Sequence, residues 1–184
     1  MHGTVEELDS NQGINRAHEA YKVGDYAKAA EIFQNLVSSF ESTGDEKNAG
    51  EMANNASVSF LRAGDPEQAL SVLQGKPKIF ESLGDNHGKA ISIGNQAAAY
   101  EALKKHKVAL DLYLEAAEIF AQEGDIELYK STMQSLSALQ LRDGKPFDAL
   151  TTMKIILNRL KNKSISNRFL ANFLDIPYRL LSRK

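Results

Sequence analysis

Cysteine is absent from this 184-residue sequence, and proline occurs only four times. Without cysteine the chain has neither disulfides nor thiolate ligands for a metal, which suits a reducing compartment. No apolar run is long enough to span a membrane, and the first residues lack the basic and then apolar order of a signal peptide. We therefore expect a cytoplasmic protein without a membrane span.

Sequence motifs of catalysis and cofactor binding are missing as well. The chain has no Gly-rich phosphate loop, no Gly-x-Ser-x-Gly and no His-x-x-x-His pair. The histidines share no helix face, so they do not favour a metal site; they are His2, His18, His87 and His106. We predict that the protein is not an enzyme, with no catalytic residues, no metal or other cofactor, and no small-molecule substrate.

The pair Gly-Asp recurs through the chain at intervals of 20 residues or a multiple of 20. It occupies positions 24–25, 44–45, 64–65, 84–85 and 124–125. Glycine just past a helix closes the last turn in the left-handed conformation, and the following Asp accepts hydrogen bonds from the first N–H groups of the next helix. Each pair therefore predicts the end of one helix and the start of another, which leaves about 18 residues for each helix. Lys104-Lys105 and Gly144-Lys145 stand where the pair is missing.

Blocks of 40 residues align two alternating kinds of helix, each with a column of small residues. The columns are Ala17, Ser57, Ala97 and Ser137 on the first helices, and Ala29, Ala69, Ala109 and Ala149 on the second helices. Small side chains let two helices approach closely, and larger residues at helical spacing fill the layer between units. Because each unit can bury its apolar face only against its neighbour, the sequence predicts an all-α solenoid of about four helix pairs.

One second helix contains the sequence Gln74-Gly75-Lys76-Pro77. Proline inside a helix removes a hydrogen bond and clashes with the preceding turn, so we expect a kink or a break there. A hinge shaped by a partner remains open, but a tolerated irregularity is favoured, because kinks at proline are common without function.

These helix pairs resemble the tetratricopeptide repeat (TPR): a small residue, an aromatic residue three positions later, and alanine twelve positions after the small one. Phe80-Glu81-Ser82-Leu83-Gly84-Asp85 and the 40-residue period are similar to the long-helix branch found in kinesin light chains. The resemblance covers residues 10–161. It implies a right-handed TPR-like helical-hairpin solenoid whose first helices line a concave face. We predict a repeat domain at 1–163 and a basic C-terminal capping helix and tail at 164–184.

A row of polar residues precedes the small column of the first helices by two positions: Asn15, Asn55, Asn95 and Ser135. An amide both donates and accepts hydrogen bonds, so such a row can pair with the backbone of an extended peptide. The resemblance implies this role for the asparagines. The alternative is bonding within their own helices, and the peptide interpretation is favoured because asparagine is a poor helix former. Neighbouring residues complete the predicted peptide-binding site: Asn54, Val58, Arg62, Ile91, Gly94, Ala98, Glu101, Gln134 and Arg142.

Small residues also form a strip at a spacing of four, at Gly94, Ala98 and Ala102. The strip either admits a side chain of a partner or lets helices pack closely, and the sequence leaves both interpretations open.

The C-terminal segment is strongly basic. From Lys154 onward it has eight basic residues and one acid, so 8−1 gives +7, and the net charge of −2 leaves −9 for residues 1–153. Such a segment could attract an acidic protein, nucleic acid or an anionic membrane surface. Its apolar residues instead favour a cap over the last repeat, and they are not interleaved with the charges as single-strand binding requires; they are Phe169, Leu170, Phe173 and Leu174.

We therefore predict a non-catalytic protein-interaction module, or scaffold, that holds a peptide segment of a partner protein in its concave groove. Two alternatives remain: anion or nucleic-acid binding through the basic C-terminal segment, and self-assembly into a homo-oligomer through the end repeats.

Overall fold

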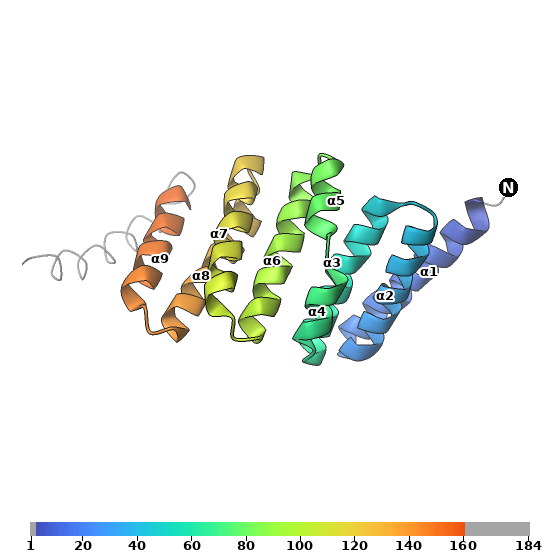
Figure 1. The fold of residues 1–184 in the computed structure, drawn as a ribbon, viewed down its shortest axis with the longest axis horizontal. Helices are drawn as coiled ribbons and strands as arrows, with labels where there is room; N and C mark the ends of the chain where they lie inside the picture. Colours follow the sequence, from blue (N-terminus) through green and yellow to red (C-terminus); the bar gives the residue numbers. More distant parts are fainter. Residues whose placement is uncertain (1–2, 161–184) are drawn as a thin grey trace, which may run out of the picture.

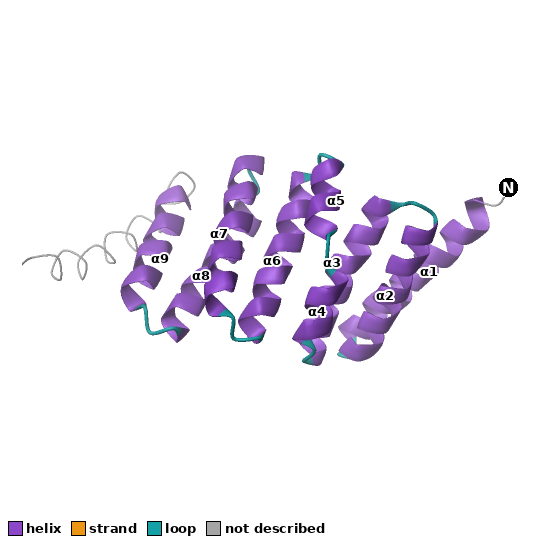
Figure 2. Cartoon of the chain, in the orientation of Figure 1, coloured by secondary structure: helices purple, strands orange, loops and turns teal. Residues whose placement is uncertain are grey.

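The computed structural model describes residues 3–160, which form a row of helices packed side by side (Figure 1). The helices are α1 (Gly3–Lys22), α2 (Tyr26–Ser42), α3 (Glu46–Ala63), α4 (Pro66–Val72), α5 (Lys76–Ser82), α6 (Asn86–Ala102), α7 (His106–Glu123), α8 (Ile126–Arg142) and α9 (Pro146–Leu160). Short loops join them, and no strand occurs in this part of the chain (Figure 2). The predicted all-α solenoid is confirmed, with α1, α3, α6 and α8 as first helices. The predicted capping helix lies outside the described residues.

The Gly-Asp pairs form the turns as predicted. The glycines have φ between 70° and 86°, at Gly24, Gly44, Gly64, Gly84 and Gly124. The carboxylate of Asp25 accepts a hydrogen bond from the backbone N–H of Lys28 at 3.1 Å, and the Asp of every other pair caps its helix in the same way. The turn before α7 lacks both residues: Lys104 adopts a φ of 59°, and Lys105 makes no capping bond with its side chain.

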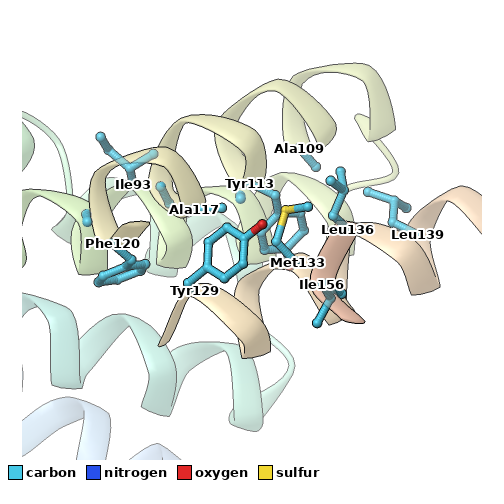
Figure 3. Close-up of a cluster of buried hydrophobic side chains, with 13 residues drawn as sticks. Ile93, Ala109, Tyr113, Ala117, Phe120, Tyr129, Met133, Leu136, Leu139 and Ile156 are labelled. Carbon is cyan, nitrogen blue, oxygen red and sulfur yellow. The ribbon is translucent and has the colours of Figure 1, made fainter. Parts of the chain in front are cut away.

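The two columns of small residues lie at the centre of the helix pairs. The alanines of the second helices are all 0% exposed, and the small residues of the first helices are 0–5% exposed. Ser137 Oγ donates to the carbonyl of Ala149 at 3.2 Å, which shows how closely α8 and α9 approach. Larger residues such as Tyr113 and Phe120 of α7 surround this layer, and Figure 3 shows them with Tyr129 of α8.

The second hairpin has a broken second helix, as the sequence predicts. Residues 73–75 separate α4 from α5, Gly75 has a φ of 78°, and Pro77 lies in the first turn of α5. Such a break leaves backbone groups without helical partners. Gln96 of α6 donates to the carbonyl of Leu73 at 3.3 Å and so satisfies one of them.

A lysine is buried at this break. Lys76 is 5% exposed, although the same position in the other second helices holds the buried apolar residues Leu36, Ala116 and Ile156. Its ammonium group pairs with the carboxylate of Glu41, which is 51% exposed. The charge is therefore compensated from the preceding hairpin, as burial of an ion requires.

Phe80 of α5 packs between two glycines. A β-carbon at Gly50 of α3 would lie 2.6 Å from its ring, and one at Gly88 of α6 would lie 2.5 Å from it. Both distances are far below van der Waals contact. One fully buried ring thus joins three helices and requires glycine on either side.

Candidate functional site

The predicted polar row lies on successive first helices. Asn15 on α1 is exposed, whereas Asn55 on α3, Asn95 on α6 and Ser135 on α8 are half-buried. Apart from Gln134, which is equivalent to the buried Asn54, the predicted site residues of these helices that stay exposed or half-buried are called the first-helix face here; they are Asn15, Asn55, Val58, Arg62, Ile91, Gly94, Asn95, Ala98, Glu101, Ser135 and Arg142.

Members of the row differ in their hydrogen bonds. Within residues 3–160, the amides of Asn15 and Asn55 have no hydrogen-bond partner. Asn95 Nδ2 donates to the carbonyl of Asn54 at 3.5 Å, which is a long bond. Ser135 Oγ donates to the carbonyl of Ser131 at 3.3 Å, inside its own helix. Asn15 and Asn55 are therefore free to bond to a peptide, whereas Asn95 and Ser135 bond to groups of this chain.

Asn54 does not lie on the open face. It is 7% exposed, and its Oδ1 accepts a hydrogen bond from Ser92 Oγ at 2.9 Å. This bond joins α3 to α6 in the interior, where a buried polar group needs such a partner. Sequence reasoning placed Asn54 beside Asn55 on the surface, but a shift of one residue turns a helical side chain by about 100°.

Glu101 and Arg142, both predicted to contact a ligand, bind each other. The guanidinium of Arg142 contacts one carboxylate oxygen of Glu101, and the hydroxyl of Tyr113 donates to the other at 2.8 Å. Burial and the adjacent carboxylate raise the pKa of the Tyr113 phenol well above its usual range, so the hydroxyl stays protonated. Sequence reasoning missed Tyr113; the one signal was a hydroxyl in a column otherwise filled by Phe33, Leu73 and Met153. The cluster ties α6, α7 and α8 together.

Arg62 also has a partner within the chain. Its Nη2 donates to the hydroxyl of Tyr26 on α2 at 2.9 Å, and its guanidinium carbon lies 5.0 Å from the centre of the Tyr26 ring. Both arginines of the predicted site are thus held in position by the preceding hairpin.

The apolar part of the face is half-buried. Val58, Ile91 and Ala98 are partly covered, and Gly94 lies beside them. A β-carbon at Gly94 would lie 3.9 Å from the β-carbon of Ala116, an ordinary contact. Close packing of α6 against α7 therefore does not require glycine at this position.

Three hollows of the described surface are lined by residues outside this face. One lies between α1 and α2, one at the turn between α7 and α8, and one beside the break of α4 and α5. Residues 3–160 contain no group of three or more His, Asp or Glu that could hold a metal ion. None of the described helices is long and apolar enough to cross a membrane.

Comparison with protein families identifies the repeat array. The model of one family, described as "Soluble NSF attachment protein, SNAP", matches residues 8–174. The chain belongs to the soluble NSF attachment protein family. The SNAP match covers the described array from residue 8 onward and continues beyond the end of α9 at Leu160. A comparison of the sequence with curated proteins gives no match.

Solved structures with TPR-like repeats share the fold of this SNAP-family chain. A Podosopora anserina kinesin light chain with nearly identical TPR-like repeats superposes with a TM-score of 0.73 at 14% identity, over 89% of this chain and 82% of the other. BtubC (BKLC) from P. vanneervenii gives a TM-score of 0.66 at 17% identity, over 87% and 74% of the two chains. The predicted TPR-type fold is thereby confirmed, whereas sequence reasoning did not reach the SNAP family itself.

Proposed function

We propose that this member of the SNAP family is a non-catalytic adaptor that binds an extended peptide segment of a partner protein along the first-helix face. One observation carries the proposal: the half-buried amide of Asn55 has no hydrogen-bond partner among residues 3–160. A half-buried amide that bonds to a peptide backbone recovers both its donor and its acceptor interactions.

The surroundings of Asn55 suit a peptide better than a small molecule. Val58 follows it one turn later on α3, and Ile91 and Ala98 lie on α6 of the same face, all half-buried. A peptide can place apolar side chains on these residues while its backbone bonds to the amides, the mode of recognition in which backbone contacts provide affinity and side-chain sites provide specificity.

The kind of partner follows from charge and from the family. Residues 1–153 have a net charge of −9, which repels nucleic acid. The family description refers to attachment of NSF, so a protein partner fits this chain better than a nucleic acid or a metabolite.

The test compares affinity capture from a native lysate by three forms of the full chain. Replacing both open amides, Asn15→Ala with Asn55→Ala, should reduce the retained partner about 5- to 150-fold, because each lost bond contributes about 0.5–1.5 kcal/mol. The helical circular-dichroism signal should not change.

Asn35→Ala is the matched control, because Asn35 is an exposed asparagine on the second helix α2. It should retain the same proteins as the unmodified chain. Equal retention by all three forms, or lower stability of the double variant with unchanged affinity, would contradict the proposal.

A further inference from the structure

The last described hairpin exposes apolar residues that earlier hairpins cover. Met153 of α9 occupies the position of Phe33, Leu73 and Tyr113, which are 2%, 0% and 6% exposed, yet Met153 is 40% exposed. In the third hairpin, the first helix of the next hairpin covers this position. Tyr113 lies in one buried cluster with Tyr129 and Met133 of α8 (Figure 3).

α8 shows the same change. Leu141 is 53% exposed, whereas its counterparts Tyr21, Leu61 and Glu101 are half-buried. Gln134 is exposed, although its counterpart Asn54 is covered by α6. We call the surface formed by Gln134, Leu141, Met153 and the half-buried Leu157 the end face.

A hollow at the opposite end of the array is polar. The hollow between α1 and α2 is lined largely by polar residues, including Arg16, Lys28, Glu31 and Asn35. Terminal repeats of a solenoid need such a polar outer surface to remain soluble. In the last described hairpin, Leu141 and Met153 expose apolar surface instead.

We propose that the chain's own residues 164–184 cover the end face, with residues 166–176 packing on α9 as the first helix of a further hairpin. The 40-residue register supports this assignment, because it aligns three apolar residues of the segment with the buried face of α8. Phe169, Phe173 and Ile176 correspond to Tyr129, Met133 and Leu136, which are 4%, 5% and 1% exposed.

The family match supports the same occupant. It runs to residue 174 and therefore includes most of the proposed helix in the pattern shared by SNAP proteins. Because proline cannot continue a helix, Pro177 would end the proposed helix, and the 11 residues 166–176 would then span about 16 Å, enough to lie across α9.

Charge favours docking within one molecule. Residues 164–184 have four basic residues and one acid, so 4−1 gives +3, against −9 for residues 1–153. The segment is attracted to the array, and its short connection to α9 gives it a high effective concentration there.

The absence of cysteine allows a direct test in the full chain. Residues 153 and 173 are equivalent in the register to Tyr113 and Met133, which lie in one buried cluster. The double variant Met153→Cys with Phe173→Cys should therefore form a disulfide within the monomer on mild oxidation. Thr151→Cys with Phe173→Cys is the matched control, because Thr151 is exposed on α9. The first pair should close about tenfold faster than the control.

Non-reducing electrophoresis and mass spectrometry distinguish the outcomes. Equal closure rates for the two pairs would overturn the proposal, because they would show no preferred placement of residue 173. Disulfide-linked dimers as the main product would also overturn it, since a second copy would then cover the end face.

Thermal unfolding provides a second measurement. Phe173→Asp should lower the melting temperature by about 4–8 °C, because a buried carboxylate would replace the ring, whereas Phe173→Leu should change it little. Equal melting temperatures for Phe173→Asp and the unmodified chain would contradict docking on the end face.

Discussion

The second and third hairpins share one period but are irregular at different places. The second has the regular turn Gly64-Asp65 and a second helix that is broken into α4 and α5. The third has the irregular turn Lys104-Lys105 and a continuous second helix, α7. The array therefore tolerates the loss of a turn signal or of helix continuity, because contacts with neighbouring hairpins supply most of the stability.

The same position has different surroundings in the two hairpins. Phe80 and Phe120 are equivalent and both are buried, but only Phe80 lies between two glycines. In the next repeat, Ala90 and Leu128 stand at the positions of Gly50 and Gly88. Phe80 thus occupies space that side chains take up at the equivalent positions beside Phe120.

The largest expected effect is the loss of the Phe80 ring. Phe80→Ala should reduce the free energy of unfolding by about 3–5 kcal/mol, as should Phe120→Ala, because each leaves a cavity in a close-packed layer. Urea denaturation measures both. A small effect at Phe80 alone would show that the broken hairpin repacks where the continuous one cannot.

Two glycines of α6 should differ in their tolerance of a side chain, because only one of them contacts the second hairpin. Gly88→Ala should cost about 1–3 kcal/mol, because its β-carbon would overlap the Phe80 ring, whereas Gly94→Ala on the same helix should be neutral or stabilising by up to about 1 kcal/mol. Combining Gly88→Ala with Phe80→Ala in a double-mutant cycle should abolish the cost of the glycine change. An unchanged cost in that background would mean that the ring is not its cause.

The buried lysine offers a third test of the break. Glu41→Gln should cost about 1–2 kcal/mol, because it leaves the ammonium group of Lys76 without its charged partner. Lys76→Met should be neutral or stabilising, because apolar residues occupy this position in the other hairpins. A large loss of stability on Lys76→Met would show that the ion pair itself holds α5 in place.

The smallest expected effect lies in the turn of the third hairpin. Lys104→Gly should stabilise the protein by about 1 kcal/mol, because glycine adopts a positive φ without steric conflict. Gly64→Lys, the reverse change in the second hairpin, should destabilise by a similar amount. Equal and opposite shifts in thermal unfolding would show that the two turns are interchangeable.

Local signals made the fold predictable. Helices α2, α3 and α8 begin directly after the aspartates of Gly-Asp pairs, and Pro77 indicated the break between α4 and α5. These features depend on residues a few positions apart, whose conformational preferences are strong enough to be read from sequence.

The site was less predictable because it depends on contacts between residues about 40 positions apart. Periodicity placed Asn55 and Asn95 on one face, but it could not show that Asn54 bonds to Ser92 in the interior. Nor did periodicity indicate that the carboxylate of Glu101 would bind the side chains of both Tyr113 and Arg142. Such pairings depend on the distances between helices, which the period alone does not specify.

Phe80 also bears on how the array unfolds. In a linear array, cooperativity comes from coupling between nearest neighbours, and a broken helix is where that coupling is expected to be weakest. The Phe80 ring crosses this point, because it contacts α3 of its own hairpin and α6 of the next. It therefore contributes, together with the hydrogen bond between Asn54 and Ser92, to the coupling that lets the two halves unfold as one cooperative unit.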